Sequence, residues 1–289
     1  MAEKSDIMHH YDDDFKFFEP IIGKSLAYSC GDWSVATSLE EAQVEKFKKI
    51  LSYAGAAHGV KTILDLGSGW GSLLNYAARN NLADYLCGVT ISPGQAEYSS
   101  KSLQKFNCDI VEGNIFDFFH EYAGEKFDCA ASIGAFEHFS NPKEFKKGEH
   151  IEKYRSFFNG VKKIVKGKFA LQTIVTLKNH KNLDAEERKK AFKIYYFLSK
   201  RIFPNSLTPP LEDVFEAIKD IYTIERYEVC TSDYAKTLRS WSANLDAVRD
   251  SLNEEVYDRY KKYFDLTAEQ YENGALAIAR FSLNPVRNK

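Results

Sequence analysis

The chain alternates between short apolar runs and segments whose apolar residues recur with a helical period. The first run, 61–66, ends at a glycine and is followed by a helical pattern over 71–80. Strands that alternate with helices form parallel βαβ units, so we predict an α/β fold with a doubly wound, mostly parallel, seven-stranded sheet. The predicted strands are 61–66, 85–90, 108–112, 127–133, 169–176, 222–229 and 275–281.

Three helical regions fall outside this alternation. Residues 1–55 precede the first strand, and residues 177–218 and 232–264 separate the later strands. No linker rich in Gly, Pro or Ser divides the chain. We therefore predict a single domain over 1–289, with 1–55 as a helical cover and the two later regions as insertions on the substrate side.

The composition is that of an ordinary globular protein, with 289 residues, 44% apolar and 28% charged. It contains no apolar run of the roughly 18 residues that a membrane span needs, and its polar start does not resemble a signal peptide. Five scattered cysteines without a CxxC pair indicate free thiols and a cytoplasmic location. His9 and His10 have no evident third ligand, so we predict no metal site.

Charge is distributed unevenly. The net charge of −2 argues against a nucleic-acid partner, yet 141–204 holds 17 Lys and Arg against 6 Asp and Glu. Such a basic face can meet an anionic membrane surface, which would place the protein peripherally at the membrane, or an acidic acyl carrier. It can equally be a solvated helix face. The sequence does not indicate an oligomeric state.

A glycine-rich loop follows the first strand, in the sequence LDLGSGWG at 64–71. Gly67 and Gly69 allow a tight turn and a close approach of a ligand to the backbone. Ser72 breaks the full GxGxxG spacing, and the second strand ends in Thr90 rather than in an acid for a ribose, which argues against a dinucleotide. Asp65 before the glycines suits S-adenosylmethionine, because that cofactor carries a methionine amino group.

Several longer motifs point to one family. The sequence resembles the cyclopropane fatty acid synthases, most closely the mycolic acid cyclopropane synthases, over nearly the whole chain. The matching motifs are HYD at 10–12, FF at 17–18, YSCGDW at 28–33, SLEEAQ at 38–43, LDLGSGWG at 64–71, GVTIS at 88–92, SIGAFEHF at 132–139, IFP at 202–204 and YAKTL at 234–238.

The resemblance implies a class I methyltransferase fold, which is Rossmann-like, and S-adenosylmethionine as cofactor. It places Asn114 and Ile115 near the adenine. The other residues that it implies as cofactor contacts are Tyr28, Ser29, Gly67, Gly69, Thr90, Ile91 and Gln95.

The family's chemistry is electrophilic. An alkene attacks the sulfonium methyl group, a base removes a proton from the resulting carbocation, and a ring closes. The resemblance implies that this base is a bicarbonate held by five groups, four of which match Cys30, Glu137, Ile174 and Tyr234. The fifth, a histidine in the family, is Gln172 here, so we expect bicarbonate to bind more weakly than in the family or not at all.

These residues favour an S-adenosylmethionine-dependent methyltransferase that acts on an alkene carbon of an acyl chain. The alternative is a small-molecule C- or N-methyltransferase on the same scaffold, in which Glu137 and His138 would handle an amine proton. Gln172 favours this alternative. A non-catalytic protein that binds the cofactor or a lipid is the least favoured class, because Glu137 and Tyr234 are retained.

Overall fold

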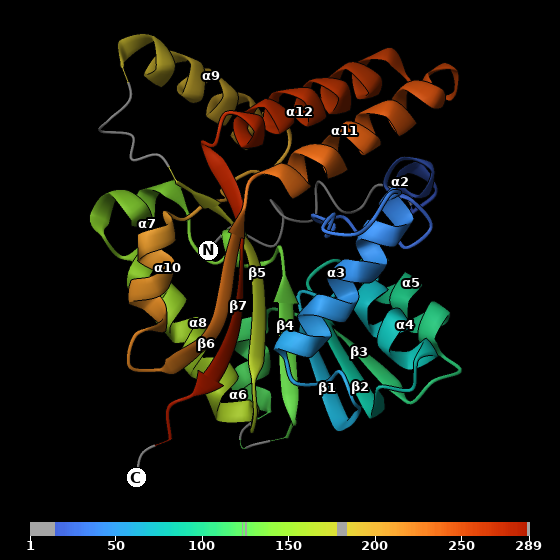
Figure 1. Ribbon diagram of the computed structural model, residues 1–289, viewed down its shortest axis with the longest axis vertical. Coiled ribbons are helices and arrows are strands. Elements are labelled where there is room, and N and C mark those ends of the chain that lie inside the picture. Colours follow the sequence, from blue (N-terminus) through green and yellow to red (C-terminus); the bar gives the residue numbers. More distant parts are fainter. Residues whose placement is uncertain (1–14, 123, 125, 178–183, 288–289) are drawn as a thin grey trace.

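Seven strands form one sheet in the order β3-β2-β1-β4-β5-β7-β6 (Figure 1). The computed structural model describes residues 15–122, 124, 126–177 and 184–287. Strands β1 to β5 pair in parallel, and β7 runs antiparallel between β5 and β6. This confirms the predicted fold class. The strands are β1 (Val60–Leu66), β2 (Ala83–Thr90), β3 (Cys108–Glu112), β4 (Cys129–Ile133), β5 (Phe169–Thr176), β6 (Tyr222–Cys230) and β7 (Leu276–Pro285).

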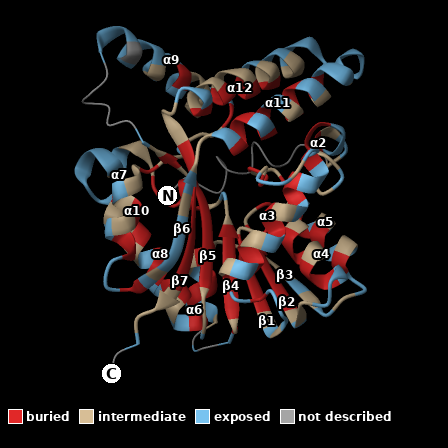
Figure 2. Cartoon of the chain, in the orientation of Figure 1, coloured by how far each residue is buried: buried red, intermediate tan, exposed pale blue. Residues whose placement is uncertain are grey.

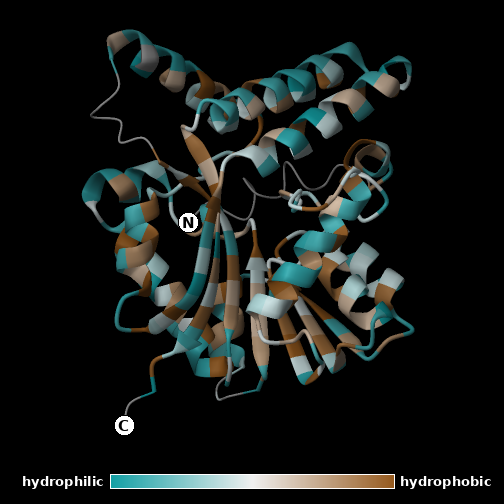
Figure 3. Cartoon of the chain, viewed as in Figure 1, coloured by the Kyte–Doolittle hydropathy of each residue, from teal (hydrophilic) through white to brown (hydrophobic). Residues whose placement is uncertain are grey.

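Helices cover both faces of the sheet and bury its central strands (Figure 2). One apolar core joins the sheet to α3 (Leu39–Tyr53), α4 (Ser72–Arg79) and α5 (Pro93–Leu103). A second core, on the other face, joins it to α6 (Ile115–Glu121) and α8 (His150–Ile164). Strands covered on both faces are apolar on both sides, which explains the continuous apolar runs in the sequence (Figure 3).

A third group of helices lies over the carboxyl ends of the parallel strands (Figure 1). It consists of α2 (Phe15–Ile22), α9 (Ala185–Arg201), α11 (Ser232–Ala247) and α12 (Glu254–Glu272). Side chains of α2, α11 and α12 share an apolar core with the residue that follows α9, Ile202. Doubly wound folds bind their ligands at this edge of the sheet, so these helices cover the expected site.

The region 177–218 does not form the single insertion that we predicted, because its two helices lie in different parts of the fold. Its α9 lies with α11 and α12 over the carboxyl ends of the strands, whereas α10 (Leu211–Ile218) packs on α8 in the layer that covers the sheet. The apolar face of α10, formed by Val214, Ala217 and Ile218, explains this placement. A short helix, α7 (Pro142–Lys147), precedes α8, and two 3₁₀ turns are η1 (Phe136–His138) and η3 (Arg249–Ser251).

Some predictions fall on residues that the structure does not describe. They are His9 and His10, the motif at 10–12, and the part of the basic segment at 178–183. Among the described residues, no helix combines the length and the apolar character needed to cross a membrane. The same residues contain no cluster of three or more His, Cys, Asp or Glu that could hold a metal ion.

Candidate active site

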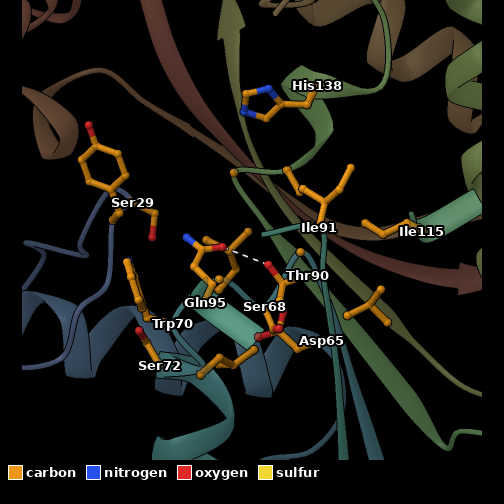
Figure 4. A pocket seen from close by; sticks show the side chains of 18 of the residues that line it. Ser29, Asp65, Ser68, Trp70, Ser72, Thr90, Ile91, Gln95, Ile115 and His138 are labelled. Carbon is orange, nitrogen blue, oxygen red and sulfur yellow. Dashed lines mark hydrogen bonds between the residues drawn. The ribbon is translucent and has the colours of Figure 1, made fainter. Parts of the chain in front are cut away.

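A pocket opens at the carboxyl ends of β1 and β2 (Figure 4). The turn after β1 forms one wall, and three of its glycines have left-handed backbones, with φ of +86° at Gly67, +54° at Gly69 and +75° at Gly71. A Cβ atom on Gly67 would lie 2.4 Å from the Cβ of Ala135, in the loop after β4. This turn therefore needs glycine for two reasons, backbone conformation and packing.

Polar side chains from β1 and β2 face this pocket. Asp65, at the end of β1, is only 2% exposed, and burial raises the pKa of its carboxyl to about 7. The hydroxyl of Thr90 donates to Oε1 of Gln95 at 2.9 Å. Because the carbonyl end of this amide is held, its N–H groups remain for a ligand near Gly69, whose Cβ would lie 3.8 Å from Nε2.

The structure brings all of the predicted cofactor residues into this one pocket. Tyr28 and Ser29 come from the loop between α2 and α3, and Asn114 caps α6 by accepting from the Phe116 N–H at 2.8 Å. A buried carboxylate, a glycine turn and amide donors fit an adenosyl amino acid. Lys46 and Trp70 also line the pocket, although the sequence did not point to them. The predicted residues found here are Tyr28, Ser29, Asp65, Gly67, Gly69, Thr90, Ile91, Gln95, Asn114 and Ile115.

We expect Gly69→Val to weaken S-adenosylmethionine binding about tenfold or more, which corresponds to about 1.4 kcal/mol. A β-branched side chain strains a backbone at φ +54° and distorts the turn beside Gln95. Isothermal titration calorimetry measures the loss. Gly59→Val is the matched control, because Gly59 has a similar backbone (φ +85°) but lies outside the pocket. Equal affinity in the two folded variants would contradict the assignment.

A second pocket adjoins the first and shares Tyr28, Ser29, Gly134 and His138 with it. Its walls include the aromatic rings of Phe203, Tyr234 and Tyr263. All of the residues predicted to take part in catalysis line this pocket, although they come from four separate parts of the chain. They are Cys30, Glu137, His138, Gln172, Ile174 and Tyr234.

Glu137 is a buried carboxyl group in this pocket whose two oxygens differ in their contacts. It sits on η1 after β4, 6% exposed, and its Oε1 accepts from the backbone N–H of Ile174 at 2.5 Å. Its Oε2 has no hydrogen-bond partner among the described residues. Burial raises the pKa of this carboxyl, and the Ile174 N–H opposes the rise. One carboxylate oxygen is thus held in place, while the other is buried in the wall of the pocket without a hydrogen-bond partner among the described residues.

Gln172 is held at both ends of its amide. Its Oε1 accepts from Nε of Arg280 at 2.7 Å, and its Nε2 donates to the Cys30 carbonyl at 3.2 Å. Arg280, on β7 and 1% exposed, also donates to Glu228 at 2.7 Å and to the Gly31 carbonyl at 2.9 Å. The sequence analysis missed Arg280. Its contact fixes the Gln172 amide with the N–H groups on the side of Cys30.

The thiol of Cys30, the phenol of Tyr234 and the imidazole of His138 are uncharged at pH 7. Burial raises the pKa values of the Cys30 thiol and, well above its usual range, of the Tyr234 phenol. Burial also lowers the pKa of His138 to about 4, although part of its ring is open to the pocket. The site therefore combines one carboxyl group, an uncharged imidazole and hydrogen-bond donors within aromatic walls.

The sheet order, the glycine turn and the acid that ends β1 define a class I S-adenosylmethionine-dependent methyltransferase. The family model of the mycolic acid cyclopropane synthetases matches residues 1–281, and the chain belongs to this family. Two relatives from Mycobacterium tuberculosis are similar over nearly their full length. Cyclopropane mycolic acid synthase 1 is 30% identical, with 96% of each chain covered, and the S-adenosylmethionine-dependent methyltransferase UmaA is 29% identical, with 94% covered.

Two solved structures of cyclopropane synthases superpose closely on this chain. The cyclopropane synthase MmaA2 from Mycobacterium tuberculosis superposes with a TM-score of 0.84 at 27% identity, with 98% of each chain covered. The mycolic acid cyclopropane synthase CmaA1, complexed with SAH and CTAB, gives the same TM-score at 26% identity and the same coverage. The protein is thus an S-adenosylmethionine-dependent methyltransferase, as the resemblance implied. Coclaurine N-methyltransferase, at 20% identity and a TM-score of 0.77, shares the fold.

Proposed function

We propose that this methyltransferase acts on an alkene carbon of an acyl chain and closes a cyclopropane ring. The observation that carries the proposal is Glu137, whose Oε2 lies in the wall of an aromatic pocket that adjoins the cofactor pocket. The family match and the relatives named as cyclopropane synthases support the same reaction. The test is the structure of the labelled product, described at the end of the Discussion.

We assign cofactor binding to the first pocket and binding of the reacting acyl chain to the second. S-adenosylmethionine, held by the residues of the first pocket, supplies an electrophilic methyl group. Attack by the alkene leaves a cation on the acyl chain, beside the rings of Tyr234 and Tyr263. Aromatic faces stabilise a desolvated cation by about 2 kcal/mol or more.

Glu137 is the proposed base. Its Oε2 takes a proton from the transferred methyl carbon, and the electron pair of that C–H bond forms the third side of the ring. The proposal is supported by the Ile174 N–H, which holds the other oxygen, and by the raised pKa of a carboxyl buried in an apolar site.

Bicarbonate fits this site less well than the resemblance implied. The Ile174 N–H, one of its implied ligands, already donates to Glu137, and Gln172 donates to Cys30 and accepts from Arg280. Tyr234 and the second N–H of the Gln172 amide remain as donors for an anion. We therefore propose that proton removal in this protein does not depend on bicarbonate.

The second candidate is a C- or N-methyltransferase of small molecules. It is favoured by the position of His138, which lines both pockets. Burial lowers the pKa of this imidazole to about 4, which keeps it uncharged and also makes it a weaker base. A neutral imidazole can accept the proton that a methylated amine releases. The nature of the acceptor in the labelled product separates this candidate from the first.

We propose that α9 takes part in substrate uptake. Phe192 (65% exposed) and Tyr196 (56%) project from this helix with their rings stacked, 6.3 Å between centroids. Exposed lysines accompany them, among them Lys189 and Lys193. The helix leads into Phe203, which lines the second pocket. A helix with basic and aromatic side chains binds the interface of an anionic membrane, so we propose that α9 docks there during substrate uptake.

We expect the protein to co-sediment with anionic vesicles and to detach as salt rises, because ionic screening acts within about 10 Å at 0.1 M. Replacing Lys189 and Lys193 by Glu should abolish the association. The matched control replaces Lys143 and Lys147 of α7, which are also exposed, by Glu. If neither pair changes binding, or if acyl carrier protein binds the helix and vesicles do not, the membrane proposal fails.

A further inference from the structure

A buried lysine lies at the wall of the cofactor pocket. Lys46, on α3, is 1% exposed and lines the pocket together with Ser29 and Asp65. Its Nζ donates to the Ser29 hydroxyl at 2.9 Å and to Oε1 of Gln43 at 2.5 Å. Gln43 in turn donates to the Ser29 carbonyl at 3.0 Å. The ammonium group is thereby fixed beside the loop that carries Tyr28 and Ser29.

The partners of Lys46 do not neutralise its charge. Its two hydrogen-bond partners are uncharged oxygens, and its Nζ also lies 4.4 Å from the ring centroid of Phe47. None of the ion pairs among the described residues involves Lys46. An ammonium group has three N–H donors, of which two are used here. Burying a cation without a counter-ion is costly, so a buried lysine beside a ligand pocket requires an explanation.

Asp65 is an acidic residue whose charge is opposite to that of Lys46. It is buried in the same pocket wall, and the charge of Lys46 acts on it. Burial lowers the pKa of Lys46 to about 7 and raises that of Asp65 to about 7, because neither charge is fully compensated. A ligand that carries one negative and one positive group would compensate both.

We propose that Lys46 binds the carboxylate of the methionine end of S-adenosylmethionine while Asp65 binds its ammonium group, so that the pair recognises the amino-acid zwitterion. Ser29 lies on the opposite side of the pocket from Ile115, the residue expected near the adenine (Figure 4). This places Lys46 and Ser29 at the end of the pocket away from the base. The inference rests on the proposed cofactor site and assigns a ligand group to one of its walls.

Two adenosyl ligands test the proposal by calorimetry. S-Adenosylhomocysteine carries the amino acid, whereas 5′-methylthioadenosine lacks it. In Lys46→Met we expect the affinity for S-adenosylhomocysteine to fall about tenfold or more, and that for 5′-methylthioadenosine to stay within about twofold. Gln43→Met is the matched control, since it disturbs the same loop but keeps the ammonium, and it should affect both ligands alike.

Equal losses for both ligands in Lys46→Met would assign the lysine to the loop and overturn the proposal, as would no loss for either. A measurement on the native protein covers the case in which the variant fails to fold. Decarboxylated S-adenosylhomocysteine should bind about tenfold more weakly than the parent compound, and equal affinities would overturn the proposal. Failure of the native protein to bind any of these ligands would instead contradict the cofactor site itself.

Discussion

Glu137→Gln slows formation of the cyclopropane product and leaves cofactor binding intact. We expect turnover to fall by about 10²–10⁴-fold, the usual contribution of a positioned acid or base. The amide oxygen of the variant still accepts from the Ile174 N–H, so the loop keeps its position. What the variant loses is the carboxylate oxygen, Oε2, that we propose as the base. Steady-state turnover and S-adenosylhomocysteine affinity, measured on the same preparation, check this prediction.

Glu121→Gln is the matched control, because Glu121 is an exposed glutamate on α6 outside both pockets, and its turnover should equal that of the native protein. Turnover by native protein in degassed buffer should be unchanged when bicarbonate is added. A bicarbonate-dependent native enzyme, or a Glu137→Gln variant that keeps its activity, would assign proton removal to a bound anion rather than to Glu137.

Arg280→Met lowers the free energy of unfolding by about 3–5 kcal/mol, the range observed when one member of a buried ion pair is removed. Arg280 is 1% exposed, and its Nη1 lies 2.7 Å from Glu228 and 3.6 Å from both Asp32 and Asp233. Lys49 also pairs with Asp32 and Glu228, so the variant retains part of the compensation. The Gln172 carbonyl oxygen loses its donor, and the Gly31 carbonyl keeps only the Cys30 thiol.

Urea unfolding of the native protein and the variant measures this difference. The matched control is Arg239→Met, since Arg239 is 44% exposed and pairs with Glu272 and Asp265 at the surface. Such exposed pairs contribute about 0–1 kcal/mol. Similar losses in the two variants would show that the cluster around Arg280 is not a structural centre of the site.

The sheet could be predicted because its central strands are largely buried, in contrast to the edge strands β3 and β6. Such strands appear as short apolar runs, and the alternation of the first five strands with helical patterns defines the parallel part of the fold. The position of α10 could not be predicted in the same way. Its apolar residues show that it packs against something, whereas only the folded chain shows that the partner is α8.

The part of the candidate cofactor pocket that follows β1, β2 and β3 could be predicted from the order of the strands, whereas Tyr28 and Ser29, which precede β1, were indicated only by the resemblance to the family. The roles of the two buried cations, Lys46 and Arg280, could not be predicted from the sequence in the same way. Lys46 lies on the buried stripe of α3 with Ala42, Gln43 and Ile50, and a lysine on an apolar stripe is a signal that the sequence did contain. Arg280 interacts with Gln172 because β5 and β7 pair antiparallel. The two residues are 108 positions apart in the sequence, and no local pattern reveals that register.

Detection of a cyclopropane ring in the labelled product tests the central claim most directly. Purified protein is incubated with S-adenosylmethionine whose methyl group carries three deuterium atoms, together with an unsaturated phospholipid and a small amine, and the products are identified by mass spectrometry. We predict an acyl product with a cyclopropane ring that retains two of the three deuterium atoms, because Glu137 removes the third during ring closure. A methylated acyl chain that retains all three, or a label found on the amine instead, would contradict the account.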